Sequence, residues 1–422
     1  MAARSPFSIA NFRFYWMARL TTMLATSAML LIIGWQVYNI ARLTMSPAAS
    51  AAQIGLVGLI QFVPLFVLTP VTGWLADRID RRNIARATAA LQILCAAALA
   101  YFTWAEAMTL PVLFVVAGLL GVARAFSGPA IGALAPNLVP REMLPNAIAL
   151  GSIAWQAGMV GGPAVGGYLY AWIPAAAYVA AGALFLVSLV CLLLIGPVPR
   201  PELDRMRHPV RQMIDGLHYV RTNRLVLGAI TLDLFAVFLA GATALLPIYA
   251  RDILQVGPEG LAQLGAAPAV GAALTALYFS FRPLRHRVGM KMLAAVMVFG
   301  VATIAFGLSR SMPLSLAALF AIGAADMFSV YVRQSLIQIH TPDAMRGRVG
   351  AVSQLTISAS NELGDAQSGF LAALIGPVAA VVAGGAGAIV VTLYYAARFP
   401  ELRHARDFEP GDIPPETKEA VT

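Results

Sequence analysis

Long apolar runs are the feature that most constrains the fold of this chain. Each is about as long as the 20 residues that a helix needs to cross a bilayer, and short polar segments separate them. Inside lipid only helices and closed barrels pair every backbone polar group, and runs of this length favour helices. The sequence therefore predicts an all-α integral membrane protein with about twelve transmembrane helices, six in each half. The runs cover residues 16–41, 52–76, 84–104, 110–134, 146–171, 174–196, 225–249, 260–281, 290–308, 313–339, 349–373 and 376–397.

The composition agrees with a chain that lies mostly in lipid. Hydrophobic residues make up 59% of the 422 residues and charged residues only 12%, whereas a soluble domain carries roughly 25% charged residues. The net charge of +9 comes from short clusters spread between the apolar runs. Because no single basic domain gathers this charge, we expect no nucleic-acid partner.

Sequence patterns for other chemistry are missing. Cys95 and Cys191 have no CxxC partner, and the five histidines show no ligand spacing, so we expect no metal site. The sequence holds no GxxxxGK[ST] loop, so we do not expect ATP as the energy source, and we expect no other cofactor. No nucleophile stands beside a base in a catalytic pattern, so we expect no enzyme.

Lysine and arginine predict the orientation in the membrane. If the N-terminus is cytoplasmic, the loops on the opposite side hold only Arg42, Arg251 and Arg310, and all other loop arginines and lysines lie inside. Moving positive charge across the membrane is unfavourable, so this asymmetry predicts that both termini are cytoplasmic. We expect a multi-pass protein of the inner (plasma) membrane.

The polar segments divide the chain into four predicted parts. An offset of 202 residues aligns the two halves, with Gly162 matching Gly364 and Arg124 matching Asp326. Parallel repeats of this kind place a substrate site between the halves, near the bilayer midplane. The four predicted parts are an N-terminal six-helix bundle (1–196), a cytoplasmic linker with an amphipathic helix (197–224), a C-terminal six-helix bundle (225–398) and a cytoplasmic tail (399–422). We expect the protein to be a monomer.

Two motifs carry a family resemblance. Residues 73–82 read GWLADRIDRR between two apolar runs, and residues 158–167 read GMVGGPAVGG. With these motifs the chain resembles the major facilitator superfamily over essentially its whole length. Asp80 stands where the family's loop motif has a glycine. The positions that match this motif are Gly73, Asp77, Arg78, Arg81 and Arg82.

The resemblance implies two pseudo-symmetric six-helix bundles and a secondary active transporter. The second motif, together with residues 360–364 (SNELG), is similar to the efflux branch that includes siderophore exporters. It implies export of an amphiphilic, siderophore-like or drug-like small molecule by alternating access, with proton antiport. The expected partners are this substrate, protons and the lipid bilayer. Two alternatives remain: a lipid or lysolipid translocator on the same fold, and a membrane sensor that transports nothing.

Charged residues inside the apolar runs are candidates for proton coupling or substrate binding. A charge at the bilayer centre costs about 2.5–3.5 kcal/mol on insertion scales, so each needs a reason. A carboxyl group that faces either side in turn can carry a proton. The alternative is that these residues form fixed buried ion pairs, such as Arg124 with an acid of residues 313–339 or 349–373. The candidates are Asp326, Glu362, Asp365, Asp233, Arg124 and Arg333.

Three further groups have predicted roles. Aromatic and amide side chains suit a cavity for an amphiphile, although helix packing uses the same residues: Trp35, Gln36, Tyr38, Asn39, Gln61, Trp155 and Gln156. Glycines allow close helix approach, and Pro163 is predicted to bend its helix at the interface between the halves. The alternative is that these residues serve ordinary helix packing: Gly158, Gly162, Pro163, Gly166 and Gly167. The Asp77 motif is predicted to act as a cytoplasmic gate that changes the conformational balance and not the ligand specificity.

Overall fold

The structure, a computed structural model, consists almost entirely of helices in its described part, which comprises residues 5–132, 134, 137–197, 209–282, 284 and 286–405. In the N-terminal half the helices are α1 (Ala10–Thr44), α2 (Pro47–Arg78), α3 (Arg81–Trp104), α4 (Leu110–Gly132), α5 (Leu144–Trp172) and α6 (Pro174–Leu194). Then follow α7 (Pro209–Thr222), α8 (Arg224–Leu239), α9 (Leu246–Ile248), α10 (Gly257–Phe281), α11 (Val288–Leu308), α12 (Met312–Ile339), α13 (Asp343–Ile375), α14 (Pro377–Arg398) and α15 (Pro400–His404).

Capping residues explain where several of these helices begin. Ser46 accepts a hydrogen bond from the Ala49 backbone at the start of α2, and Pro47 fills the first helical position, where no backbone donor is needed. Asp80 accepts from the Arg82 backbone at the start of α3. The Asn223 side chain accepts a hydrogen bond from the Val226 backbone at the start of α8. These three polar residues cap the N-termini of α2, α3 and α8.

Eleven stretches of the described chain are long and apolar enough to cross a membrane. They cover eleven of the twelve predicted runs. The remaining run, 349–373, lies within α13, which has 33 residues but carries several polar and charged side chains, Glu362 and Asp365 among them. The prediction of an all-α membrane protein is therefore confirmed, and α13 is its most polar long helix by sequence.

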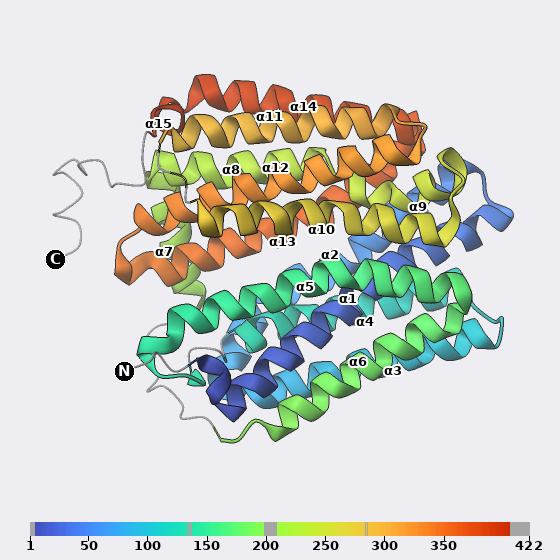
Figure 1. Cartoon of the computed structure of the whole chain (residues 1–422), viewed down its shortest axis with the longest axis horizontal. Helices are drawn as coiled ribbons and strands as arrows, with labels where there is room; N and C mark the ends of the chain where they lie inside the picture. Colours follow the sequence, from blue (N-terminus) through green and yellow to red (C-terminus); the bar gives the residue numbers. More distant parts are fainter. Residues whose placement is uncertain are drawn as a thin grey trace.

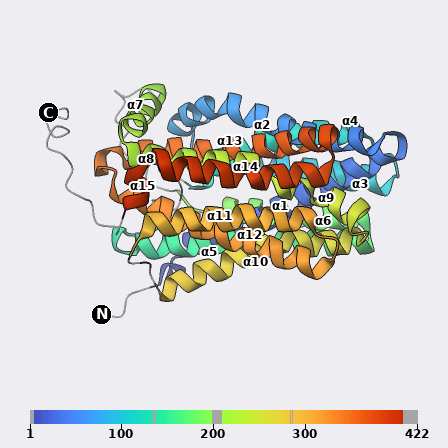
Figure 2. The same ribbon diagram turned by 90° about the horizontal axis from the view of Figure 1, so that it is seen from above.

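The long helices form two bundles that lie side by side (Figures 1 and 2). In one, α1 packs on α5 and α6, α3 on α4 and α6, and α2 on α4; in the other, α10 packs on α12, α11 on α12 and α14, and α13 on α8. The bundles meet chiefly where α2 packs on α13 and α5 on α10. We call the side where α1 begins and α14 ends the terminal end, and the opposite side the far end.

The seventh predicted run is not one continuous helix. The sequence predicts it over 225–249, but α8 ends at Leu239 and a turn at Ala240 and Gly241 follows. The chain then forms η4 (Ala242–Leu245), α9 and the π-helical turn η5 (Tyr249–Ile253). A Cβ at Gly241 would lie 2.8 Å from the carbonyl oxygen of Gly364 in α13. The break therefore lets the backbone approach α13 closely, and it carries η5 to the far end.

The starts of α4 and α12 keep the interval of the predicted internal repeat. Helix α4 begins at Leu110 and α12 at Met312, an interval of 202 residues. Arg124 and Asp326 consequently occupy equivalent positions, each fourteen residues from the start of its helix.

Helix α7 lies in the predicted linker and packs against α13. The Asp215 carboxylate contacts the Arg348 guanidinium at 3.1 Å, and a Cβ at Gly216 would lie 2.8 Å from the Arg348 carbonyl oxygen. Ile214 and Leu217 are exposed on its other side. The linker helix is thus attached to the C-terminal half at the terminal end.

Candidate substrate and proton site

An ion pair joins the two bundles inside the apolar region. The Arg124 guanidinium of α4 lies 2.7 Å from a carboxylate oxygen of Glu362 in α13, and the same nitrogen donates to the Gln61 side chain of α2 at 3.2 Å. The Arg124 side chain is 30% exposed, whereas that of Glu362 is 9% exposed. The pair therefore has one accessible partner and one buried partner.

This group lies near mid-depth. Gln61 and Arg124 are each fourteen residues from the far-end terminus of their helices, and Glu362 is thirteen residues from the end of α13. At 1.5 Å per residue these positions lie about 20 Å below the far end. The acid that pairs with Arg124 is Glu362, which lies within the predicted run 349–373.

Two further acids lie at a similar depth without a visible ion pair. Asp365 follows Glu362 by three residues, so the two side chains occupy neighbouring positions on α13. Asp326 lies on α12 at the level of Arg124. Within the described part of the chain, neither aspartate forms a salt bridge. Both are partly buried. They are therefore the mid-depth acids whose charge no neighbouring arginine pairs directly.

Arg333 and Asp233 form a separate ion pair between α12 and α8. Their side chains are 2% and 7% exposed. Although Arg333 and Asp326 share a face of α12, Arg333 is paired with Asp233. The pair lies wholly within the C-terminal bundle, so its geometry supports a structural role more directly than substrate contact.

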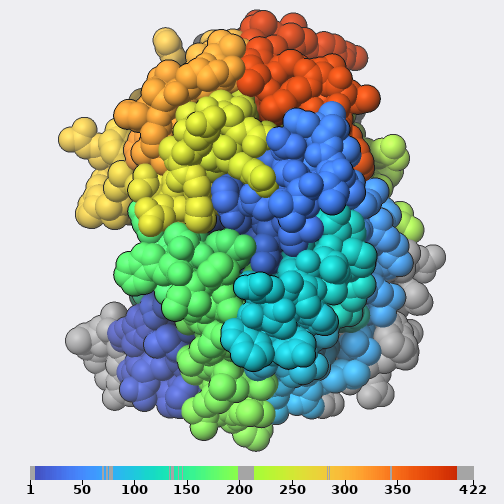
Figure 3. Space-filling view, turned by 90° about the vertical axis from the view of Figure 1, so that its right-hand side faces the viewer, coloured from blue at the N-terminus to red at the C-terminus, as the bar shows by residue number. Residues whose placement is uncertain are grey.

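At the far end the bundles approach at backbone distance. A Cβ at Gly58 of α2 would lie 2.9 Å from the Ala366 nitrogen of α13, and one at Gly55 would lie 2.8 Å from the Ala366 carbonyl oxygen. Figure 3 looks onto this end, where the blue residues of α1 and α2 adjoin the yellow and red segments of the C-terminal half. Small residues thus allow α2 and α13 to close the far end.

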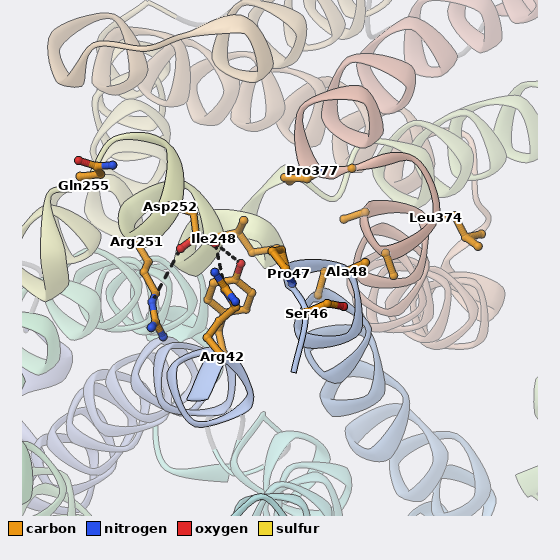
Figure 4. Close-up of a pocket in the computed structure, with 15 residues that line it drawn as sticks. Arg42, Ser46, Pro47, Ala48, Ile248, Arg251, Asp252, Gln255, Leu374 and Pro377 are labelled. Carbon is orange, nitrogen blue, oxygen red and sulfur yellow. Dashed lines mark hydrogen bonds and ion pairs between the residues drawn. The ribbon is translucent and has the colours of Figure 1, made fainter. Parts of the chain in front are cut away.

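Polar contacts across the two halves reinforce this closure (Figure 4). Asp252 of η5 accepts a hydrogen bond from the Tyr38 hydroxyl at 2.5 Å and pairs with Arg42 at 3.4 Å. Arg251 donates to the Asn39 side chain at 2.5 Å and to its carbonyl oxygen at 3.1 Å. We call these five residues the far-end bridge.

The close glycine contacts between α2 and α13 lie toward the far end. At Gly128 and Gly132 of α4, and at Gly347 and Gly350 of α13, which lie toward the terminal end, no described atom outside the local helix lies within 4 Å of the position of an added Cβ. At the far end, by contrast, glycines of α2 and α13 have backbone neighbours within 3.0 Å. The tight backbone packing of these two helices is therefore confined to the far-end side of the four terminal-end glycines.

The α5 glycines divide between two neighbours. Added Cβ atoms at Gly158, Gly162 and Gly166 would meet residues of α1 in the same bundle, whereas Gly167 faces Ala262 of α10. Pro163 also contacts α10, where its Cβ would lie 3.2 Å from a Cβ at Gly265. Close helix approach is thus present, but only Pro163 and Gly167 take part in the contact between halves.

The predicted cavity residues are dispersed. Gln36 donates to Thr103 and accepts from Tyr178 inside the N-terminal bundle, and Trp35 is buried. Tyr38 and Asn39 belong to the far-end bridge and Gln61 to the Arg124 group. Trp155 is 42% exposed. The Gln156 side chain reaches the Ala269 carbonyl oxygen of α10 at 3.4 Å. Only part of this predicted set therefore lies near the mid-depth acids.

The predicted gate motif is described in part. Residues 73–78 belong to α2, but the surroundings of Gly73 and the side chains of Asp77 and Arg78 lie outside what the structure describes. Arg82 pairs with Asp80 at 2.6 Å and donates to the Ile195 carbonyl oxygen after α6 at 3.1 Å. The Arg82–Ile195 contact thus ties the start of α3 to the end of α6, and the role of Asp77 stays a prediction.

Sequence reasoning missed Asp252, the centre of the far-end bridge. The charge pattern of the sequence marks Arg42 and Arg251 only as rare positive residues on the predicted outer side. Two isolated arginines on a side otherwise poor in positive charge could have indicated a need for a carboxylate partner nearby.

The Asp252→Asn substitution is expected to loosen the far end. It removes the charge from two contacts with α1 of the N-terminal half, the Tyr38 hydrogen bond and the Arg42 ion pair. Such contacts contribute about 1.5–3 kcal/mol each, so the closed far end should lose at least roughly a factor of ten in population. The measurement is the alkylation rate of Ala51→Cys, a buried position of the far end, by an impermeant maleimide. Glu259→Gln, the same chemical change at an acid outside the bridge, is the control. An unchanged rate in Asp252→Asn would contradict this account.

The geometry defines a class: a membrane protein of two helical bundles that meet at one end around a charged mid-depth site. The model of the Major Facilitator Superfamily matches residues 24–364. The chain therefore belongs to the major facilitator superfamily, and it is a transporter of that family.

Known proteins agree with this assignment. The chain is 29% identical over 367 residues to the enterobactin exporter EntS of Escherichia coli K12, covering 86% of each chain. It is 28% identical over 368 residues to the enterobactin exporter EntS of Shigella dysenteriae serotype 1, again with 86% of each.

Solved structures support the fold alone. A bacterial homologue of the human lysosomal transporter Spinster, in an inward-facing and occupied conformation, superposes with a TM-score of 0.72 at 15% identity, covering 94% of this chain and 98% of that one. The POT family transporter PepTSo superposes with a TM-score of 0.74 at 12% identity, covering 95% of this chain and 99% of that one.

Proposed function

We propose that this protein exports an amphiphilic small molecule in exchange for protons by alternating access. The similarity to enterobactin exporters supports efflux of a siderophore-like or drug-like compound. The single observation that carries the proposal is the Arg124–Glu362 pair, because it connects the two bundles at mid-depth beneath the closed far end.

The chemistry of this pair suits exchange. A carboxylate that pairs with an arginine is held in its charged form, and protonation weakens the pair. When Glu362 takes up a proton, Arg124 and Gln61 are freed for other contacts, while Asp365 and Asp326 offer further acceptors. Movement of one bundle against the other would then expose these groups to the opposite side.

The orientation follows from charge. The positive-inside pattern supports a cytoplasmic terminal end. The far end then faces outward, and we propose that the state with a closed far end is the one open toward the cytoplasm. An exporter accepts its substrate in this state. We propose the inner membrane as the location, a monomer as the working unit, and Gly73, Asp77, Arg78, Arg81 and Arg82 as the cytoplasmic gate of the opposite state.

A transport assay tests the proposal. Enterobactin is the first ligand to use, followed by a panel of amphiphilic drugs, in inside-out vesicles with an imposed pH gradient. Uptake that rises with the gradient and collapses when it is dissipated is expected. Uptake that ignores the gradient would overturn proton antiport, and movement of lipids alone would indicate a lipid translocator.

A further inference from the structure

The far end contains a pocket whose lining comes from both halves. Its volume is about 800 Å³. Figure 4 shows that the end of α1 and the start of α2 form one side, while η5 and the turn between α13 and α14 form the other. A ligand held here would therefore contact both bundles at once.

The polar side of this far-end pocket carries excess positive charge. Among its fifteen lining residues there are two arginines, Arg42 and Arg251, and a single acid, Asp252. Their side chains are 25%, 29% and 29% exposed. The Nε and Nη1 atoms of both arginines contact Asp252, Asn39 or the Met45 carbonyl oxygen. Neither Nη2 atom makes a hydrogen bond to a described residue, so both guanidinium groups keep donors for an anion.

Another part of the pocket lining is apolar. Pro47 and Ala48 of α2 face Leu374 and Pro377 around the turn between α13 and α14. Leu374 is 81% exposed. A ligand with one anionic group and an apolar body matches both surfaces, whereas a cation would meet two guanidinium groups.

We propose that this pocket binds an amphiphilic anion from the outer side and thereby holds the far end closed. A ligand that contacts both halves binds the closed state better than a state in which they separate, so it shifts the population toward closure. The consequence for transport rests on the proposed function: the bound anion slows export, and an anionic product would inhibit its own release from outside.

Protection of an introduced thiol measures occupancy without requiring transport. Ala48→Cys lies in the pocket lining at an exposed position, and both natural cysteines are buried. In nanodiscs of neutral lipid, 4-phenylbutyrate should slow alkylation of this thiol by an impermeant maleimide. Its amide and amine counterparts, 4-phenylbutyramide and 4-phenylbutylamine, should not, and inorganic phosphate should protect less because it lacks the apolar body.

A matched pair of variants separates charge from structure. Ser46 lines the pocket and caps α2, and both aspartate and asparagine are good capping residues. Ser46→Asp, combined with Ala48→Cys, should raise the half-protective concentration of 4-phenylbutyrate roughly fivefold or more relative to Ser46→Asn, through charge repulsion. Neither change removes a residue of the far-end bridge.

The outcomes are distinct. Protection in phosphatidylglycerol nanodiscs without any probe identifies a lipid headgroup as the anion, and protection by the probe alone identifies a soluble one; both support the site. Equal protection by the amide, equal behaviour of Ser46→Asp and Ser46→Asn, or no protection in either type of nanodisc would overturn it. Because the assay needs no proton gradient, a failure of proton antiport would leave its result unaffected.

Discussion

Asp233→Leu should lower the free energy of unfolding by about 3–5 kcal/mol, since it leaves a buried arginine without its partner. Arg333 is 2% exposed and Asp233 is 7% exposed, so water cannot replace the lost carboxylate without local unfolding. The measurement is denaturant or thermal unfolding of the purified protein in a neutral detergent.

The double variant Asp233→Leu/Arg333→Met should recover most of this loss, because two apolar side chains replace two buried charges. Glu401→Gln provides the control. It removes the partner of Arg224 on the same helix α8, but those side chains are 36% and 52% exposed, so its effect should stay below about 1 kcal/mol. If the single and double variants were equally unstable, the destabilisation would not come from an unpaired charge.

Glu362→Gln should abolish accumulation of substrate against its gradient while leaving the protein folded. Glutamine preserves the shape of the side chain and can still accept a hydrogen bond from Arg124, but it cannot gain and lose a proton. One proton exchanged per substrate across a pH gradient of about one unit supports at most about tenfold accumulation. In the variant this ratio should fall to about one, because no free energy passes from the proton gradient to the substrate.

Exchange of labelled for unlabelled substrate at equal concentrations is the companion measurement. It requires the conformational cycle but not the proton gradient, so it should persist in Glu362→Gln. Glu259→Gln, which lies outside the mid-depth group, should accumulate substrate like the natural protein. Accumulation by Glu362→Gln at the natural level would remove Glu362 from the coupling step.

The helical architecture was predictable because the membrane imposes it. An apolar run of about 20 residues has few alternatives in lipid, so eleven of the twelve runs reappear among the candidate spans. The break at Gly241 was not predictable, since its residues are as apolar as those of a continuous helix. Only the contact of Gly241 with Gly364 of α13 shows why the backbone turns there.

The charged residues were predictable as a set but not as pairs. Rare charges in apolar runs mark Arg124, Glu362, Asp233 and Arg333, yet spacing along one helix does not say which helix lies opposite. The structure assigns Arg124 to Glu362 and Arg333 to Asp233. Asp252 escaped notice because an acid near a predicted loop is ordinary by sequence, and only the fold brings it to Tyr38 and Arg42.

The most direct test of proton-for-substrate exchange at Glu362 is the pH dependence of substrate binding. Exchange requires that a proton on Glu362 and a bound substrate exclude one another. Enterobactin affinity would be measured for the purified natural protein and for Glu362→Gln over the same pH range, so that titration of the ligand itself contributes equally to both. The account predicts that affinity falls more steeply with decreasing pH in the natural protein than in the variant, by up to about tenfold per pH unit for one linked proton. The same pH dependence in both proteins would contradict it.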